Sequence, residues 1–152
     1  MDYEQYSRAN PIIVKDDDLF LHGTSSNNFL NIRQTGFLKQ AILIRNWGNS
    51  PNGICFEKYV KGENDVVLEV VAKYCRIACE KDNSQEGVIL QITGKELKKL
   101  GCPILADWNL GLIIGIDSDS AILSIIVECD VPVEYLKELK SIPFKDLLKG
   151  RF

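Results

Sequence analysis

The chain has 152 residues, of which 45% are hydrophobic and 26% charged, and its formal net charge is −3. A chain of this length forms one domain and buries a substantial core, and its composition excludes disordered, collagen-like and low-complexity proteins. The slightly acidic balance gives no general attraction to nucleic acid or to anionic membranes. No apolar run approaches the ~20 residues that a membrane-spanning helix requires, so we expect no membrane partner.

The five cysteines form no C-x-x-C pair, and only one histidine is present. We therefore expect free, mostly buried thiols and no metal site. The opening residues 1–4 lack the positive and apolar regions of a signal peptide. Free thiols and the absence of such a leader favour a cytoplasmic protein, or one that is delivered into the cytosol of a target cell.

In the first half of the chain, residues 1–11 are polar and are expected to form an arm, leaving 12–152 as the domain. The pattern then predicts two short strands around an acidic turn, at 12–14 and 19–21. A turn-and-cap stretch at 22–26 leads into a helix with Phe29, Leu30 and Ile32 toward the core, which ends at Gly36. Further expected elements are a strand or apolar edge at 37–44, a loop at 46–53 and a brief strand at 54–56.

In the second half, residues 67–80 have helical spacing, although their valines would also suit a strand, and 87–92 form the clearest strand. Thr93 and Glu96 form a capping box for a short helix that ends at Gly101. Strands are expected at 110–116 and 121–127, and a closing helix at 132–140 with Pro132 in its first turn. This sequence of about six strands and four short helices lacks βαβ regularity, so it predicts a single compact α+β domain.

His22, Gly23 and Thr24 follow the apolar strand residues Phe20 and Leu21, and they are the first candidate site. A histidine at a strand end reaches ligands at the sheet rim, and a following glycine lets a ligand approach the backbone closely. The alternative for this tripeptide is structural, with His22 bonding the next turn and Gly23 supplying a positive φ.

The surrounding spacing resembles the histidine-type ADP-ribosyltransferases, a family that includes the poly(ADP-ribose) polymerases. The similarity runs over about residues 19–140 as a series of short motifs in the family's order. These motifs are Leu21-His22-Gly23-Thr24 with the helix around Asn28 to Gly36, Gly53-Ile54-Cys55-Phe56, Ala72-Lys73-Tyr74-Cys75, Gly87-Val88-Ile89-Leu90, and the final stretch Ser124 to Leu136.

The resemblance implies a fold of split, mostly antiparallel β-sheets with a few short helices, and NAD as the co-substrate. It implies that Gly23 clamps the nicotinamide amide, that His22 and Thr24 bond ribose hydroxyls, and that Tyr74 stacks on the nicotinamide ring. The second motif places Cys55 and Phe56 beside NAD. Tyr74 has an alternative interpretation as an ordinary core-facing helix residue.

Two positions depart from the family's pattern. Cys55 stands where the family has tyrosine, and Ser124 stands where its last strand begins with the catalytic glutamate. That glutamate bonds the nicotinamide ribose and polarises the bond that breaks. Candidates for a replacement acid are Glu128, on the same strand face as Ser124 but ~13 Å further along, and the preceding Asp117 and Asp119.

We therefore expect an NAD-dependent mono-ADP-ribosyltransferase, a pentosyl-transferring glycosyltransferase, that modifies a macromolecular acceptor, protein or nucleic acid. It would act as a toxin or effector with a neutralising antitoxin as partner. One alternative is a catalytically impaired domain that binds NAD, ADP-ribose or a protein. Another is an interaction domain with no nucleotide site. Trp47 and Trp108 are candidate stacking residues for a base or an acceptor, or else loop hydrophobes that cover the core.

Overall fold

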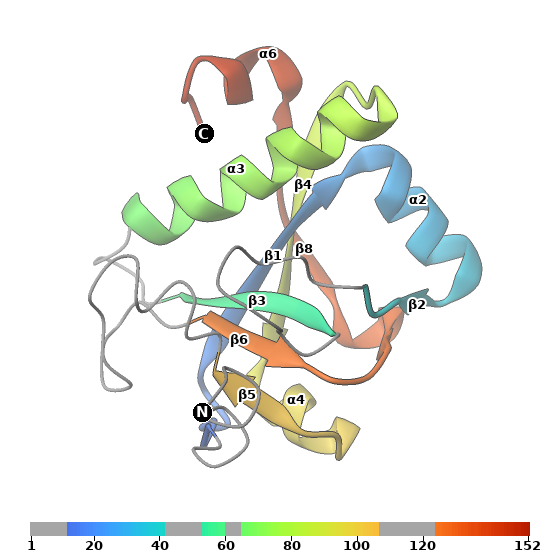
Figure 1. Ribbon diagram of the computed structural model, residues 1–152, viewed down its shortest axis with the longest axis vertical. Helices are drawn as coiled ribbons and strands as arrows, with labels where there is room; N and C mark the ends of the chain where they lie inside the picture. Colours follow the sequence, from blue (N-terminus) through green and yellow to red (C-terminus); the bar gives the residue numbers. More distant parts are fainter. Residues whose placement is uncertain (1–11, 42–52, 60–64, 107–123) are drawn as a thin grey trace, which may run out of the picture.

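The computed structural model describes residues 12–41, 53–59, 65–106 and 124–152 (Figure 1). The predicted N-terminal arm, 1–11, lies outside these residues. The elements in chain order are β1 (Leu19–Ser25), α2 (Ser26–Thr35), β2 (Phe37–Leu38), β3 (Ile54–Tyr59), α3 (Asp65–Asp82), β4 (Glu86–Thr93), α4 (Gly94–Leu100), β5 (Ile104–Ala106), β6 (Ser124–Val127), β7 (Val131–Pro132), the 3-10 helix η1 (Val133–Tyr135), β8 (Lys137–Pro143) and α6 (Phe144–Leu148).

The strands form one antiparallel sheet of six, in the order β5-β6-β3-β1-β4-β8, and a small sheet of β2 and β7. Helix α3 lies across β1 and β4 on one face of the large sheet, with α6 beside it (Figure 1). The molecule is thus a single compact α+β domain, and the predicted fold class is confirmed.

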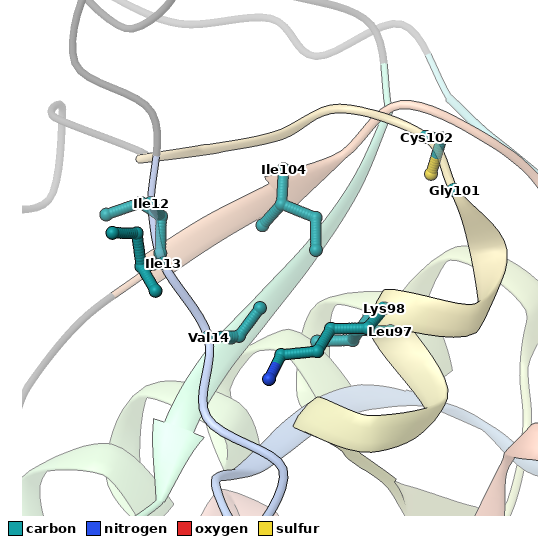
Figure 2. A pocket seen from close by; sticks show the side chains of 8 residues that line it. All are labelled: Ile12, Ile13, Val14, Leu97, Lys98, Gly101, Cys102 and Ile104. Carbon is teal, nitrogen blue, oxygen red and sulfur yellow. The ribbon is translucent and has the colours of Figure 1, made fainter.

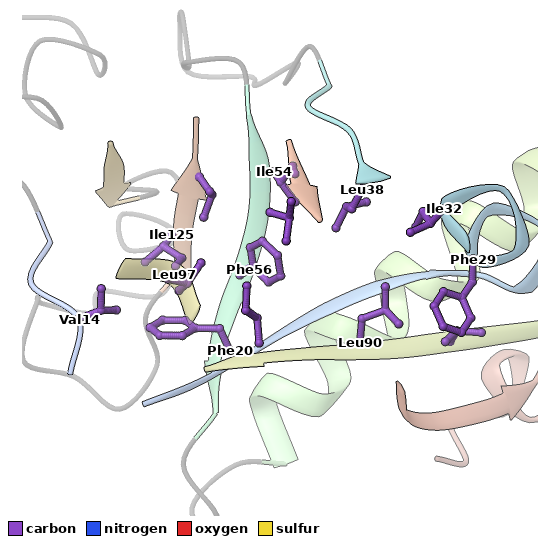
Figure 3. Close-up of a cluster of buried hydrophobic side chains, with 14 residues drawn as sticks. Val14, Phe20, Phe29, Ile32, Leu38, Ile54, Phe56, Leu90, Leu97 and Ile125 are labelled. Atoms are coloured by element: carbon purple, nitrogen blue, oxygen red, sulfur yellow. The ribbon is translucent and has the colours of Figure 1, made fainter. Parts of the chain in front are cut away.

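Two apolar clusters cover the two faces of the large sheet. Residues of β1 alternate between them, because successive side chains of a strand point to opposite faces. Phe20 belongs to the cluster in Figure 3, together with Phe56, Leu90 and Ile125. Leu21 belongs to the cluster under α3, which also contains Val71, Cys75, Ile89, Ile142 and Leu147.

Both predicted helix caps around β1 and β4 are confirmed. The Ser25 side chain accepts a hydrogen bond from the Asn28 amide, and α2 ends at Gly36 with φ 86°. Thr93 accepts in the same way from the Glu96 amide, and α4 ends at Gly101 with φ 70°. Ser and Thr satisfy orphan amides at helix starts, and glycine adopts the left-handed conformation that ends a helix. Leu30 was expected toward the core, but it is 55% exposed.

Several expected elements are wrong in the N-terminal half. Residues 12–14 lie outside any strand, although the acidic turn at Asp16 and Asp17 is present. The predicted turn at 22–26 is instead the second half of β1, because residues 22–25 pair with β4. Of the strand or apolar edge expected at 37–44, Phe37 and Leu38 form a strand, Ala41 forms an isolated bridge with Gly53, and 42–44 lie outside the described residues.

The closing helix predicted at 132–140 is also wrong. Pro132 pairs with Phe37 in the small sheet, only Val133–Tyr135 forms a helical turn, and β8 then pairs with β4 at the edge of the large sheet. β5 and α6 were not expected. Of the strand predicted at 121–127, Ser124–Val127 is strand, and the one predicted at 110–116 lies outside the described residues.

The expectation that all five thiols are free is wrong for one pair. Cys102 and Cys129 form a disulfide that links the segment before β5 to the segment after β6. Cys55, Cys75 and Cys79 are not disulfide-bonded, and the last two are buried on one face of α3.

Candidate functional site

The strands β1 and β3 run together for only a few residues and then separate. β1 pairs with β4 along all of Leu19–Ser25, but its register with β3 covers Leu19–Leu21 alone. Figure 1 shows the two strands running apart beyond this point. We call this place the fork. His22 was expected at a strand end; it lies in mid-strand, as the first residue of β1 beyond the fork.

His22 connects β1 to β3 across the fork. Its Nδ1 lies 2.7 Å from the carbonyl oxygen of Cys55, and its ring centroid lies 5.4 Å from that of Phe56. Burial lowers the pKa of His22 below its usual 6.5, against a smaller opposing effect of the Cys55 carbonyl. A neutral imidazole that donates its Nδ1 proton to a carbonyl keeps Nε2 as an acceptor.

Gly23 lies directly beneath α3. A Cβ at this position would be 2.3 Å from the Val71 carbonyl oxygen and 3.0 Å from Cys75 Sγ, so no side chain fits between β1 and the helix. Gly23 is nevertheless partly exposed. Because α3 covers one face and Ile89 of β4 pairs along one edge, the exposed atoms of Gly23 lie toward the fork or the opposite face.

Thr24 is buried and is held by α2. Its Oγ1 accepts a hydrogen bond of 2.7 Å from Asn28 Nδ2, which leaves the hydroxyl proton to be donated. Thr24 shares its sheet face with His22, by the alternation of the strand. The motif residues Thr24 and Asn28 therefore fix the start of α2 beside the fork.

The three other residues expected to bind NAD differ in how deeply they are buried. Phe56 is fully buried beneath His22, so it supports the imidazole from the core. Cys55 is partly exposed, and its carbonyl receives the His22 bond. Tyr74 is half-buried on α3, one residue before Cys75 and three after Val71, the two residues that meet Gly23.

Ser124, the residue in register with the family's glutamate, contacts an acid on the neighbouring strand. Ser124 pairs directly with Glu57 of β3, and its Oγ donates a hydrogen bond of 2.8 Å to Glu57 Oε1. Both residues are 3% exposed. Glu57 was not predicted from the sequence. An acid directly after the apolar residues Ile54 to Phe56 was a usable signal, but the pairing with Ser124 was not visible in sequence.

The other candidate acids lie elsewhere. Glu128 follows β6 at the end remote from Ser124, where its amide bonds the Pro103 carbonyl. Asp117 and Asp119 lie outside the described residues, as do Trp47 and Trp108. The structure therefore brings His22, Gly23 and Cys55 together at the fork, and it does not bring Glu128 beside Ser124.

The buried thiols of α3 are poorly suited to nucleophilic chemistry. Burial raises the pKa of Cys75 to about 12 and, with the nearby Asp82 and Glu80, that of Cys79 to about 11. Within the described ranges, no three His, Cys, Asp or Glu side chains are grouped to hold a metal ion. None of the helices described there is long and apolar enough to cross a bilayer.

A separate hollow lies between residues 12–14 and α4 (Figure 2). Its lining is mainly aliphatic and includes none of the residues predicted for NAD or catalysis. The lining residues are Ile12, Ile13, Val14, Leu97, Lys98, Gly101, Cys102 and Ile104. The chemistry-bearing residues are those of the fork, which is therefore the candidate site.

Comparison of the chain with protein-family models, with curated proteins and with solved structures gives no match.

Proposed function

We propose that this chain is an NAD-dependent mono-ADP-ribosyltransferase that breaks the nicotinamide–ribose bond and passes ADP-ribose to a macromolecular acceptor. The observation that carries the proposal is the position of His22 and Gly23, where β1 has just parted from β3 and a ligand can approach the strand's free edge. The choice of NAD as the substrate comes from the resemblance of the motifs to those of the ADP-ribosyltransferases.

His22 suits the recognition of a ribose. Its Nδ1 is engaged by the Cys55 carbonyl, and no described residue hydrogen-bonds its Nε2. Because burial keeps the imidazole neutral near pH 7, Nε2 can accept a hydrogen bond from a sugar hydroxyl. The ring is held in this orientation by Phe56 and by the Cys55 bond, so little conformational entropy is lost when the sugar binds.

Gly23 and Tyr74 suit the nicotinamide. A primary amide offers one carbonyl and two N–H groups, which match the N–H and C=O of an exposed backbone residue. Tyr74 lies on the helix that crosses Gly23, and an aromatic face attracts the flat, cationic pyridinium ring. Together these groups would hold the ring and the ribose in fixed relative positions.

The reaction needs few protein groups. The C1′–N bond breaks with its electron pair on nicotinamide, which becomes neutral, and the positive charge passes to the ribose as an oxocarbenium ion. A nucleophile of the acceptor, or water, forms the new bond to C1′ and releases its proton to solvent. The protein accelerates this by orienting the sugar and by stabilising the positive charge that develops on it.

The test is incubation of the chain with labelled NAD and a cell lysate, beside His22→Ala. We expect label on a macromolecule with the wild type, and a loss of about 100-fold or more with the variant, since positioning groups supply effects of this size. Glu69→Gln, an exposed change on α3, is the control. Equal labelling by wild type and His22→Ala would remove His22 from the site.

A second candidate is a domain that binds NAD or ADP-ribose without cleaving it. The observation in its favour is Ser124, which has no carboxyl at the position where the resemblance requires one. Saturable binding of the nicotinamide mimic 3-aminobenzamide, with no release of nicotinamide from NAD over several hours, would select this function over the transferase.

A further inference from the structure

The disulfide between Cys102 and Cys129 extends the pairing of β5 with β6. Ile104 of β5 lies opposite Val127 of β6, and the two cysteines lie two residues outward from this pair, one before β5 and one after β6. The residues in between are joined by a backbone hydrogen bond of 3.2 Å, so the register is kept up to the disulfide. The disulfide therefore bridges two directly opposed positions at the end of a short ladder.

Among the described strands of the large sheet, β5 is the shortest. It has three residues and lies at the edge of that sheet, beside β6. The chain reaches it from α4 through Gly101, whose φ of 70° ends the helix. A short edge strand opens at a lower free-energy cost than strands such as β1 and β4, each of which is paired on both sides. The disulfide therefore secures the part of the sheet that opens most readily.

The disulfide is partly exposed to solvent. Neither Cys102 nor Cys129 is buried, whereas Cys75 and Cys79 are buried under α3. Exposed disulfides exchange with other thiols more readily than protected ones, because an attacking thiolate needs access to a sulfur atom. Cys102 also lines the hollow between residues 12–14 and α4 (Figure 2). An attacking thiolate can therefore approach the bond from the hollow.

The hollow suits an apolar surface of a protein partner. Its volume is about 420 Å³, the size of a binding cleft, and its lining is mainly aliphatic. Ile13, in that lining, is 91% exposed. Covering such a side chain with an apolar surface stabilises a complex by about 1.5–3 kcal/mol. An aliphatic surface beside an exposed disulfide therefore fits a thiol–disulfide oxidoreductase, which must bring its own dithiol against the bond.

The charges along the chain favour attack at the sulfur of Cys102. Both of its neighbours in sequence are uncharged, whereas Cys129 lies between Glu128 and Asp130. An attacking thiolate is an anion, which these two carboxylates repel. Cys102 is therefore the sulfur that a partner attacks, and Cys129 is the leaving thiol.

We propose that the Cys102–Cys129 disulfide is redox-active, and that the hollow is the surface on which a dithiol oxidoreductase docks to open it. A thiolate of the partner attacks Cys102 Sγ, the bond between the two cysteines breaks, and its electron pair leaves on Cys129 Sγ, which takes up a proton. The partner's second thiol then gives up its proton and attacks the partner's own sulfur in the mixed disulfide. Cys102 leaves as a thiolate and is protonated, so two electrons have passed from the dithiol, which becomes a disulfide. None of these steps involves NAD or the fork.

The experiment follows the release of the Cys102 and Cys129 thiols from the oxidised chain by alkylation and mass spectrometry. The reductant is either thioredoxin, kept reduced by its reductase and NADPH, or dithiothreitol alone. We expect thioredoxin to act at least about tenfold faster than dithiothreitol at the same concentration, because docking places its thiolate against the bond. Ile13→Asp should lose about tenfold in rate with thioredoxin, and its rate with dithiothreitol should change less than about twofold.

Ile77→Asp is the matched control, because Ile77 is another exposed isoleucine, on α3 and outside the lining of the hollow. It should match the wild type with both reductants. Thioredoxin that acts no faster than dithiothreitol overturns the proposal, and equal rates for Ile13→Asp and Ile77→Asp overturn the docking surface. A wild-type dimer that Ile13→Asp converts to monomer in sedimentation also overturns it, since a second copy then occupies the hollow. Faster reduction after removal of residues 1–10 does the same, since the arm then covers it.

Opening the bond should loosen β5 and leave the rest of the domain folded. Amide NMR spectra compare the oxidised chain, the reduced chain and Cys102→Ser with Cys129→Ser, which cannot form the bond. We expect resonances of β5 to shift or broaden in the last two, while those of β1 and β4 keep their positions. Glutathione disulfide should return the reduced wild type to the oxidised spectrum. Unchanged β5 resonances, shifts that extend through β1 and β4, or a bond that does not re-form would overturn the redox role.

Discussion

The imidazole of His22 and the carbonyl of Cys55 join two strands whose backbones have ceased to pair. The bond is 2.7 Å long and stands immediately past Leu21, the last residue of β1 in register with β3. A side chain thus continues the connection between the two strands beyond their last paired residues. Because only one histidine is present in the chain, each consequence of this bond can be measured without interference from another imidazole.

The pKa of His22 predicts an acid-sensitive stability. Burial holds this pKa below 6.5, so folding favours the neutral imidazole. The stabilisation is complete above about pH 6.5 and is lost as the pH falls from there through the pKa of the folded state. Urea unfolding between pH 8 and pH 5 should show a steeper loss for wild type than for His22→Gln, which does not titrate. If the free energies of unfolding of the two proteins changed with pH in parallel, the lowered pKa of His22 would be contradicted.

Gly23→Ala should destabilise the packing of α3. The new Cβ would lie 2.3 Å from the Val71 carbonyl oxygen, which is backbone and cannot rotate away. We expect a loss of about 1–3 kcal/mol in the free energy of unfolding, the usual cost of overpacking. Hydrogen exchange should become faster at the amides of α3 around Val71 and Cys75.

Gly36→Ala is the matched control for that change. It meets open space but has a φ of 86°, so it carries the strain of a left-handed residue without a clash. Its effect on hydrogen exchange should be confined to the end of α2. The close contact of Gly23 with α3 would be contradicted if Gly23→Ala left hydrogen exchange in α3 unchanged, or if Gly36→Ala accelerated it as well.

Asp82 should anchor the start of α2 to the end of α3. Its carboxylate accepts hydrogen bonds from Ser25 Oγ and from the amide and hydroxyl of Ser84. Burial raises the pKa of Asp82, but these bonds together outweigh it and the pKa lies below 3.8. The stabilisation is therefore present above about pH 3.8 and lost as the pH falls below it.

Asp82→Asn should cost about 1.5–3 kcal/mol near pH 7, the range for hydrogen bonds to a charged group. Chemical denaturation measures this loss, with Glu69→Gln as the control. The difference between wild type and Asp82→Asn should shrink as the pH is lowered below about 3.8, through the pKa of the folded state. A difference that stays constant over this range would show that the carboxylate charge is irrelevant.

The disulfide between Cys102 and Cys129 predicts sensitivity to reductant. It joins two residues that are 27 positions apart in the sequence. Cross-links of this span stabilise by about 2–4 kcal/mol, chiefly by restricting the unfolded chain. Wild type should melt at a lower temperature in reductant, whereas Cys102→Ser with Cys129→Ser should melt at one temperature in both conditions. Alkylation of five thiols in the oxidised protein would refute the bridge.

Local signals predicted the parts of the fold that local chemistry determines. Ser25, Gly36, Thr93 and Gly101 begin or end helices because their own side chains or backbone freedom satisfy the helix ends. The prediction of a helix after Pro132 was wrong because the Lys, Glu and Leu residues of this stretch are good helix formers. Pairing with β4 overrides that preference, and an exposed, charged edge strand shows no alternation of buried residues.

The site was predictable in part for the same reason. His22, Gly23 and Tyr74 were proposed as site residues because their motifs are short and continuous in sequence. Glu57 was not, because its significance depends on pairing with Ser124, 67 residues away. The disulfide likewise joins residues whose proximity results from the pairing of β5 with β6.

The dual pairing of β3 makes the fork intolerant of length changes inside that strand. One inserted residue between Phe56 and Glu57 would turn the carboxyl to the opposite surface, because strand side chains alternate with a period of two. The same insertion would break the match to β1 and β6 together, since Glu57 is in register with both. We therefore expect homologous chains that vary freely in their loops to keep the spacing from Gly53 to Glu57 constant.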